Sequence, residues 1–292
     1  NITWGGTGKT PVVAFIADML SKKNRKASIL IRGYGNDESE LLPKLTLNVP
    51  VLVGRDRVKT GRLAIEERFS DTIILDDGFQ YRRLKRDLDI VCIDAVNPFG
   101  NRWLIPAGSL REGFGSLKRA DIFLLTKTDL ASDKDRLEKL QNKLRSVNPK
   151  AIIAKAIHRP LYFYRLSSED SVRRSEQGSE QGSDRRTELE KVNISELKNK
   201  EIVLVSAIGS PECFEKTIQR LGLKINKHFI FRDHHRYKKE DLAHIEDYCR
   251  KNKLDTVVTT EKDAVKLKQS VVSGLWSVVL VLKVRLEIIE NE

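Results

Sequence analysis

The chain is poor in cysteine, and its three cysteines (Cys92, Cys213 and Cys249) lie far apart and form no CxxC pair. This spacing argues against a disulfide framework or a zinc cluster and favours a reducing compartment. The sequence also has no run of about 18 apolar residues, so it predicts no membrane-spanning helix within these residues. It carries no helix-turn-helix, zinc or RNA-recognition signature, and its basic residues are not interleaved with aromatic ones. We therefore expect no nucleic-acid partner.

What the sequence does contain is the composition of a folded globular protein. Hydrophobic residues make up 40% and charged residues 32% of 292 positions, enough for one large or two medium α/β domains. The formal net charge of +12 suits nucleic acid, an anionic membrane surface or a phosphorylated substrate, and the charge by itself does not choose among them. The chain opens at Asn1, in what reads as a strand-to-loop transition, so we expect a further N-terminal segment before it.

Short apolar runs alternate with amphipathic stretches, which predicts a doubly wound, mostly parallel α/β sheet followed by a second, smaller α/β domain. The predicted strands are Ala27–Ile31, Pro50–Val53, Thr72–Leu75, Asp89–Ile93, Asp121–Leu125, Glu201–Ser206, His228–Phe231, Thr256–Thr259 and Ser277–Leu282. The predicted helices are Pro11–Lys22, Val58–Phe69, Asp133–Val147, one after Pro211, and Lys239–Lys251.

The predicted domains are 1–157 for nucleotide binding and catalysis and 201–292 for a smaller domain that closes over the site. Between them, residues 158–200 form a linker. Within this linker, residues 168–190 contain the polar repeat SEQGSEQGSD, which has almost nothing to bury. Such a composition is typical of a disordered insertion.

The segment GGTGKTP opens the first predicted helix and has the residues of a phosphate-binding loop. Glycines allow backbone N–H groups to approach phosphate oxygens, and the helix N-terminus favours negative charge. Lys9 would reach the β- and γ-phosphates, and the hydroxyl of Thr10 would ligate Mg²⁺. The strict pattern has glycine where this chain has Thr3, so the loop is closer to the deviant GGxGKT form. The predicted nucleotide-binding residues are Gly5, Gly6, Thr7, Gly8, Lys9 and Thr10.

A second acidic signal is TIILDDGFQ, in which an apolar strand ends at Asp76 and Asp77. Ligands of open α/β sheets bind at the carboxyl ends of the strands, where one of these carboxylates would hold Mg²⁺. The alternative is a simple Asp-Gly turn at the end of a strand. The two motifs together predict a P-loop NTPase-like fold that uses ATP and Mg²⁺ for phosphoryl transfer.

The stretch TKTD, Thr126–Asp129, leaves a second nucleotide-dependent function open. It follows an apolar strand and is similar to the NKxD motif by which GTPases read guanine, although Thr126 stands in place of the usual asparagine. A P-loop GTPase is therefore the alternative to an ATP-dependent kinase, and a non-catalytic relative is a third possibility.

Seven stretches follow one another in a characteristic order: NITWGGTGKTP, IRGYGNDE, VLVGRDR, DDGFQYRRLKRDLDIVCID, NPFGNRWLIPAGSLRE, FRDHHRY and TTEKDAVKL. This series resembles the tetraacyldisaccharide 4′-kinase family, which phosphorylates the lipid A disaccharide precursor. The resemblance covers nearly the whole chain apart from residues 167–190. It implies transfer of the γ-phosphoryl group of ATP to the 4′-hydroxyl of the disaccharide 1-phosphate.

The resemblance also implies roles for individual residues. Asp76 and Glu112, with Thr10, are implied as metal-binding residues. Asp37 and His234 are implied as an acid–base pair at the acceptor hydroxyl, beside Lys9 as a catalytic residue. From the residues alone, the alternative for Asp37 is a helix N-cap, and His235 could replace His234.

The predicted substrate-binding residues are Arg32, Asp77, Gln80 and Arg111. The planar guanidinium of arginine suits the phosphate that the lipid already carries, although a solvated charged face is the rival interpretation. The family resemblance further implies an anionic membrane surface as a partner. The expected location is the cytoplasmic face of the bacterial inner membrane, reached peripherally or monotopically through the N-terminal segment.

Overall fold

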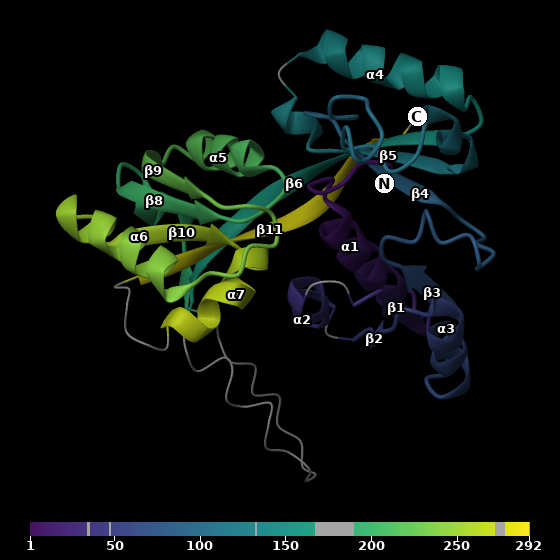
Figure 1. Ribbon diagram of the computed structural model, residues 1–292, viewed down its shortest axis with the longest axis horizontal. Coiled ribbons are helices and arrows are strands. Elements are labelled where there is room, and N and C mark those ends of the chain that lie inside the picture. Colours follow the sequence, from purple (N-terminus) through teal and green to yellow (C-terminus); the bar gives the residue numbers. More distant parts are fainter. Residues whose placement is uncertain (34–35, 47, 132, 167–189, 272–277, 292) are drawn as a thin grey trace. The chain divides into compact units, whose positions relative to one another are not determined.

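The computed structural model describes residues 1–33, 36–46, 48–131, 133–166, 190–271 and 278–291. The chain divides into two compact units, which Figure 1 colours along the sequence. The first unit comprises Asn1–Arg159 and Arg285–Glu292, and the second comprises Pro160–Val284. The predicted linker at 158–200 and its insertion stay predictions, since residues 167–189 lie outside the described residues.

The first unit begins with a small parallel sheet of strand order β2-β1-β3. Its elements, in chain order, are α1 (Lys9–Lys22), β1 (Ala27–Ile31), α2 (Asn36–Leu45), β2 (Val51–Val53), α3 (Arg57–Glu66) and β3 (Thr72–Leu75). Strand β1 is buried at every position, as expected for a continuous apolar run covered on both faces. Helix α1 contributes Val13 and Ala17 to the same core as Ile29 and Ile31 of β1.

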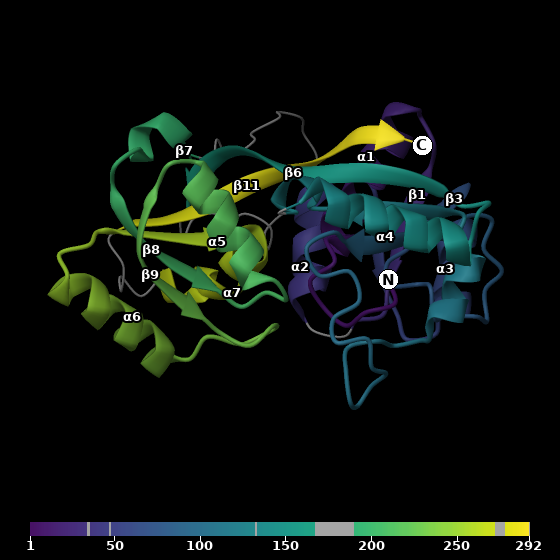
Figure 2. The same cartoon turned by 90° about the horizontal axis from the view of Figure 1, so that it is seen from above.

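The rest of the first unit belongs to the main sheet. Its elements are β4 (Ile90–Asp94), the 3₁₀ helix η1 (Phe114–Arg119), β5 (Ile122–Thr126), the 3₁₀ helix η2 (Thr128–Leu130), α4 (Lys134–Val147) and the start of β6 (Ile152–Arg165). Strands β4, β5 and β6 run parallel, with Asp94 opposite Thr126. Figure 2 shows α4 alongside β6, and Leu140 and Leu144 of α4 share a core with Ile153 of β6.

The second unit continues the pattern. Its elements are the end of β6, β7 (Lys191–Val192), the 3₁₀ helix η4 (Ile194–Leu197), β8 (Glu201–Ser206), α5 (Pro211–Arg220), β9 (Lys224–Ile230), α6 (Lys239–Lys251), β10 (Thr256–Thr260), α7 (Glu261–Val271) and the start of β11 (Val278–Asn291). The strand order of the main sheet is β4-β5-β6-β11-β10-β8-β9, with β7 antiparallel to β6. This is the mostly parallel α/β fold that the sequence predicts.

All nine predicted strands and all five predicted helices are present, four of the fourteen with the predicted bounds: β1, β3, β8 and α6. Helix α1 begins at Lys9, two residues before the predicted start at Pro11. Helices α2 and α7, strand β6 and most of β11 were not predicted. Among the described residues, no helix is long and apolar enough to cross a membrane.

Candidate functional site

The phosphate loop has left-handed backbone at three of its glycines. Gly5, Gly6 and Gly8 have φ values of 72°, 57° and 78°, a region that residues with a Cβ rarely adopt. Gly8 is the N-cap of α1, and no side chain of the described residues caps this N-terminus. The first N–H groups of a helix have no partner within the helix, and they carry partial positive charge. The loop therefore offers N–H donors to an anion.

A side chain at Gly8 would not fit. A Cβ built there lies 2.9 Å from Cε1 and 3.1 Å from Nε2 of His158, which comes from β6. Burial, followed by the charge of Lys127, lowers the pKa of His158 to about 4, so its imidazole is neutral at physiological pH. The neutral imidazole therefore packs against Gly8 and adds no positive charge beside the loop.

Asn1 and Gln80 hold the start of the loop in place. The side-chain amide of Asn1 donates to the carbonyl of Thr3 at 2.6 Å and to the hydroxyl of Thr7 at 3.1 Å. Gln80 was predicted to bind substrate, and its Nε2 donates to the carbonyl of Asn1 at 3.0 Å. Its Oε1 is buried without a hydrogen-bond partner among the described residues, so this amide has an acceptor left for a ligand.

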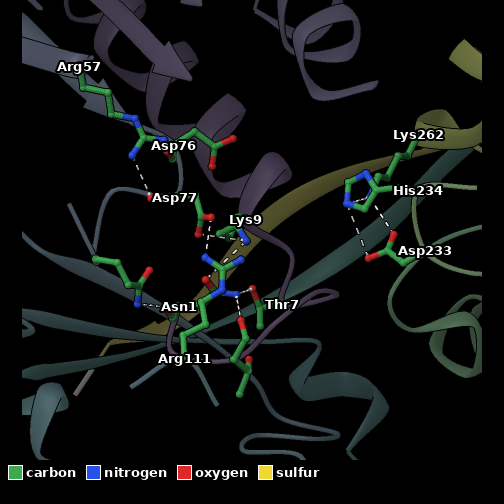
Figure 3. Close-up of polar contacts among 12 residues, drawn as sticks. Asn1, Thr7, Lys9, Arg57, Asp76, Asp77, Arg111, Asp233, His234 and Lys262 are labelled. Atoms are coloured by element: carbon green, nitrogen blue, oxygen red, sulfur yellow. Dashed lines mark hydrogen bonds and ion pairs between the residues drawn. The ribbon is translucent and has the colours of Figure 1, made fainter. Parts of the chain in front are cut away.

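Lys9, Asp77 and Arg111 form an ion-pair network beside the loop (Figure 3). Lys9 Nζ lies 3.3 Å from Asp77 Oδ1, and Arg111 Nη1 lies 2.6 Å from Asp77 Oδ2. Burial favours the neutral acid, but the positive charges of Lys9 and Arg111 outweigh it and lower the pKa of Asp77 to about 2. Asp77 therefore carries a full negative charge that holds both cations at the loop. A bound phosphate would compete with Asp77 for Lys9.

Asp77 is placed by an unusual backbone and by an arginine that sequence reasoning missed. Its φ is 52°, which turns the chain sharply after Asp76 at the end of β3. Arg57 is buried and donates from Nη2 to the carbonyl of Asp76 at 2.7 Å and from Nη1 to the carbonyl of Asp77 at 3.1 Å. Arg57 thus fixes the backbone that carries both carboxylates. Its position inside the VLVGRDR stretch was the only signal for it.

The predicted metal ligands come from three elements. Thr10 lies in the first turn of α1, and the carboxylate of Asp76, 2% exposed as a residue, follows β3. Glu112 pairs with Arg119 Nη2 at 2.9 Å and with Arg82 Nη2 at 3.1 Å. Burial raises the pKa of Glu112, but its bonds to the two arginines outweigh this effect and lower it.

Within the described ranges, no group of three or more His, Cys, Asp or Glu side chains is arranged to hold a metal ion. A magnesium site built from one hydroxyl, one carboxylate and phosphate oxygens does not need such a group. The donors present therefore fit Mg²⁺ held together with a nucleotide.

In the first unit, Arg32 is exposed and directly follows β1, at the same sheet edge as Asp76, whose N–H donates to the carbonyl of Leu30 at 3.0 Å. Asp37 lies in the first turn of α2, but its side chain is outside the described residues. The structure therefore places Lys9, Asp77, Gln80 and Arg111 around one loop, and the role predicted for Asp37 stays a prediction.

In the second unit, His234 is part of a charged cluster with Asp233 and Lys262 (Figure 3). Lys262 Nζ lies 3.3 Å from His234 Nε2 and 2.9 Å from Asp233 Oδ1. His234 has φ of 63°, and its N–H donates to the carbonyl of Ala207 at 3.3 Å. The neighbouring His235 instead bonds Asp241 at 2.7 Å and stacks on Phe231. His235 thus has a structural role, and the role predicted for His234 stays a prediction.

A left-handed glycine loop that opens a helix, carries a lysine and faces a strand-end carboxylate defines a P-loop phosphotransferase on this α/β fold. Comparison with known proteins makes the class specific. The family model described as LpxK, tetraacyldisaccharide-1-P 4′-kinase, matches residues 1–42 and 36–292. The chain belongs to this family.

The similar proteins agree with the family model. The tetraacyldisaccharide 4′-kinase of Halothermothrix orenii is 34% identical over 92% of this chain and 73% of its own length. The enzyme of Bdellovibrio bacteriovorus is 35% identical over 95% of this chain and 81% of its own length. A crystal structure of LpxK from Aquifex aeolicus in complex with ATP superposes with a TM-score of 0.64 and 27% identity, over 99% of this chain and 82% of that one.

Proposed function

We propose that this chain transfers the γ-phosphoryl group of Mg-ATP to the 4′-hydroxyl of a tetraacyldisaccharide 1-phosphate, the precursor of lipid A. Membership of the family makes the chain a tetraacyldisaccharide 4′-kinase. The observation that carries the proposal is the glycine loop ahead of α1, with Lys9 held beside it by Asp77. The family relationship sets aside the GTPase alternative that the TKTD stretch left open.

The loop and its cations account for the handling of the nucleotide. The N–H groups at the start of α1 point the positive end of the helix at the phosphates. Lys9 exchanges its partner Asp77 for a γ-phosphate oxygen and stabilises the charge that spreads over the phosphoryl group during transfer. Arg111 keeps Asp77 neutralised when Lys9 leaves it, because its guanidinium remains 2.6 Å from the carboxylate.

For the magnesium ion, we propose Thr10, Asp76 and Glu112 as the residues that hold it directly or through water. Mg²⁺ prefers oxygen ligands and keeps several waters, which suits this sparse set of donors. When bound, the ion neutralises charge on the β- and γ-phosphate oxygens. Arg119 and Arg82 donate hydrogen bonds to the carboxylate of Glu112 and so fix its orientation.

For the acceptor, we propose that Asp37 takes the proton of the sugar hydroxyl and that His234 orients this carboxylate. A sugar hydroxyl is a poor nucleophile, so a base at its proton accelerates attack. Lys262 and Asp233 hold His234 in place, with Lys262 Nζ 3.3 Å from His234 Nε2 and 2.9 Å from Asp233 Oδ1. Arg32 and Arg111 are proposed contacts of the phosphate already on the substrate, with Gln80 and Asp77 beside them.

We further propose that residues 1–157 bind the nucleotide and that residues 201–292 supply His234 and close over the site. We propose that the chain acts at the cytoplasmic face of the bacterial inner membrane, because four acyl chains hold the substrate in a membrane. The net charge of +12 supports attraction to anionic lipid, worth about 1 kcal/mol for each basic residue near the surface.

The position of the new phosphate on the lipid product tests this proposal. The chain is incubated with ATP, Mg²⁺ and the disaccharide 1-phosphate lipid, and phosphorus NMR locates any new phosphate on the sugar. We expect a phosphate at the 4′ position with ATP and far less product with GTP. Hydrolysis of either nucleotide without phosphorylated lipid would contradict the proposal.

A further inference from the structure

The TKTD stretch at the end of β5 contacts the phosphate loop directly. Lys127 is buried, 6% exposed, and its Nζ donates to the carbonyl of Gly6 at 2.6 Å. Thr126, fully buried, donates from its hydroxyl to the carbonyl of Thr7 at 3.0 Å. Thr126, the last residue of β5, and Lys127, which follows it, therefore hold two consecutive carbonyls of the loop.

A carboxylate from the neighbouring strand holds the lysine in this position. Asp94 ends β4, opposite Thr126 in the sheet register, and its Oδ2 lies 2.5 Å from Lys127 Nζ. Its Oδ1 accepts from the N–H groups of Val96 at 2.9 Å and Asn97 at 3.3 Å. A buried ion pair persists only when its geometry and hydrogen bonds are good, and this one has three bonds on the carboxylate. The ammonium is thus fixed before any ligand arrives.

The direction of these bonds sets the direction of the loop amides. In a trans peptide the C=O and the following N–H point in opposite directions. Since the carbonyls of Gly6 and Thr7 point at β5, the N–H groups of Thr7 and Gly8 point away from it. An anion bound by these amides must therefore lie on the side opposite to β5. Freed from Lys127, the peptide of Gly6 could rotate, because glycine allows many backbone conformations.

We propose that Lys127, held by Asp94, is a positioning residue that orients the phosphate-loop amides toward the β- and γ-phosphates. In this role the TKTD stretch acts on the phosphate end of the nucleotide and does not read its base. The proposal rests on the proposed function only in placing ATP at the loop. It assigns a purpose to a motif that phosphoryl transfer itself does not explain.

The test separates phosphate binding from base binding. Lys127→Met is compared with Lys139→Met, the same change at an exposed position of α4, and with Lys127→Arg, which keeps the charge. Dissociation constants for ADP and for adenosine are measured by calorimetry on the whole chain. Because the lost bond involves a charged donor, we expect Lys127→Met to lower the affinity for ADP by about 10- to 100-fold. Adenosine should bind as in the parent, Lys127→Arg should recover part of the loss, and Lys139→Met should change nothing.

A second variant keeps the test decisive if Lys127→Met does not fold. Thr126→Val removes one hydroxyl at nearly constant volume, whereas Thr126→Ser retains it. We expect Thr126→Val to lower ADP affinity several-fold, Thr126→Ser to lower it less, and neither to change adenosine affinity.

Equal loss of ADP and adenosine affinity, or no loss of either, would overturn the proposal. So would a change in the preference of Lys127→Met for ADP over GDP, since this would make TKTD a base-reading motif. Because ADP binding is measured without lipid, failure of the parent chain to phosphorylate lipid would count against the proposed function and leave the positioning role standing.

Discussion

Replacing Gly8 by alanine should damage the loop through two separable effects. The residue has φ of 78°, and an added Cβ would lie 2.9 Å from the imidazole of His158. The first effect is backbone strain, which belongs to position 8 alone. The second is a steric clash, which needs both side chains. A double-mutant cycle with His158→Ala distinguishes them.

The structure sets the size of each effect. A left-handed backbone costs an L-residue about 1–2 kcal/mol, and an extra methyl group in a filled space costs about 1–3 kcal/mol. Gly8→Ala should therefore lower the free energy of unfolding by about 2–5 kcal/mol. With His158 already truncated to alanine, the same change should cost only the backbone part, about 1–2 kcal/mol.

Urea unfolding of the four proteins above neutral pH, where His158 is neutral, measures the cycle. We expect a coupling energy of about 1 kcal/mol or more between the two positions, with the double variant more stable than the two single losses predict. Strict additivity, within about 0.5 kcal/mol, would refute the reasoning, because it would show that His158 does not pack against Gly8.

Three further predictions concern other parts of the site. The pKa of Asp77 is lowered to about 2. Its ion pairs should therefore add about 2 kcal/mol of stability above pH 4, and this stability should be lost as the pH falls toward 2. Asp77→Asn should flatten this part of the curve of stability against pH. Arg57→Met should lower the free energy of unfolding by about 2–4 kcal/mol, because the buried carbonyl of Asp76 and the partly buried carbonyl of Asp77 lose their donor; an unchanged urea midpoint would contradict this. Asp37→Ala and His234→Ala should each lower kcat strongly with ATP affinity intact, and their double variant should be little worse than the poorer single one; additive losses would show that they do not act as a unit.

The features that the sequence predicted best were those encoded by adjacent residues. GGTGKT predicts a phosphate loop by itself, because the glycines, lysine and threonine of such a loop are close together in the sequence at the start of a helix. Likewise β1 is a plain apolar run, and it was predicted with its observed bounds. Helix α7 was missed because it follows β10 without an intervening loop residue. Strand β6 was missed because it contains Pro160, which reads as a break in a strand.

The contacts that position the site could not be predicted because they depend on strand register and long-range packing. Lys127 meets Gly6 only because β5 ends at the level of the loop, more than a hundred residues away in the chain. Arg57 meets the carbonyls of Asp76 and Asp77 only because α3 begins next to the end of β3. Lys127 stood out only as part of TKTD and Arg57 only as part of VLVGRDR, and neither pattern shows which carbonyls the side chain contacts.

The measurement that tests the central claim most directly is phosphoryl transfer from γ-labelled ATP to the lipid by the Lys9→Met variant. Lys22→Met is the matched control, since Lys22 lies on the same helix and pairs with Asp18 in solvent. We expect Lys9→Met to lower kcat by roughly 100-fold or more through lost stabilisation of the transferring phosphoryl group, with Lys22→Met equal to the parent. Near-normal transfer by Lys9→Met would show that the loop is not the site of catalysis.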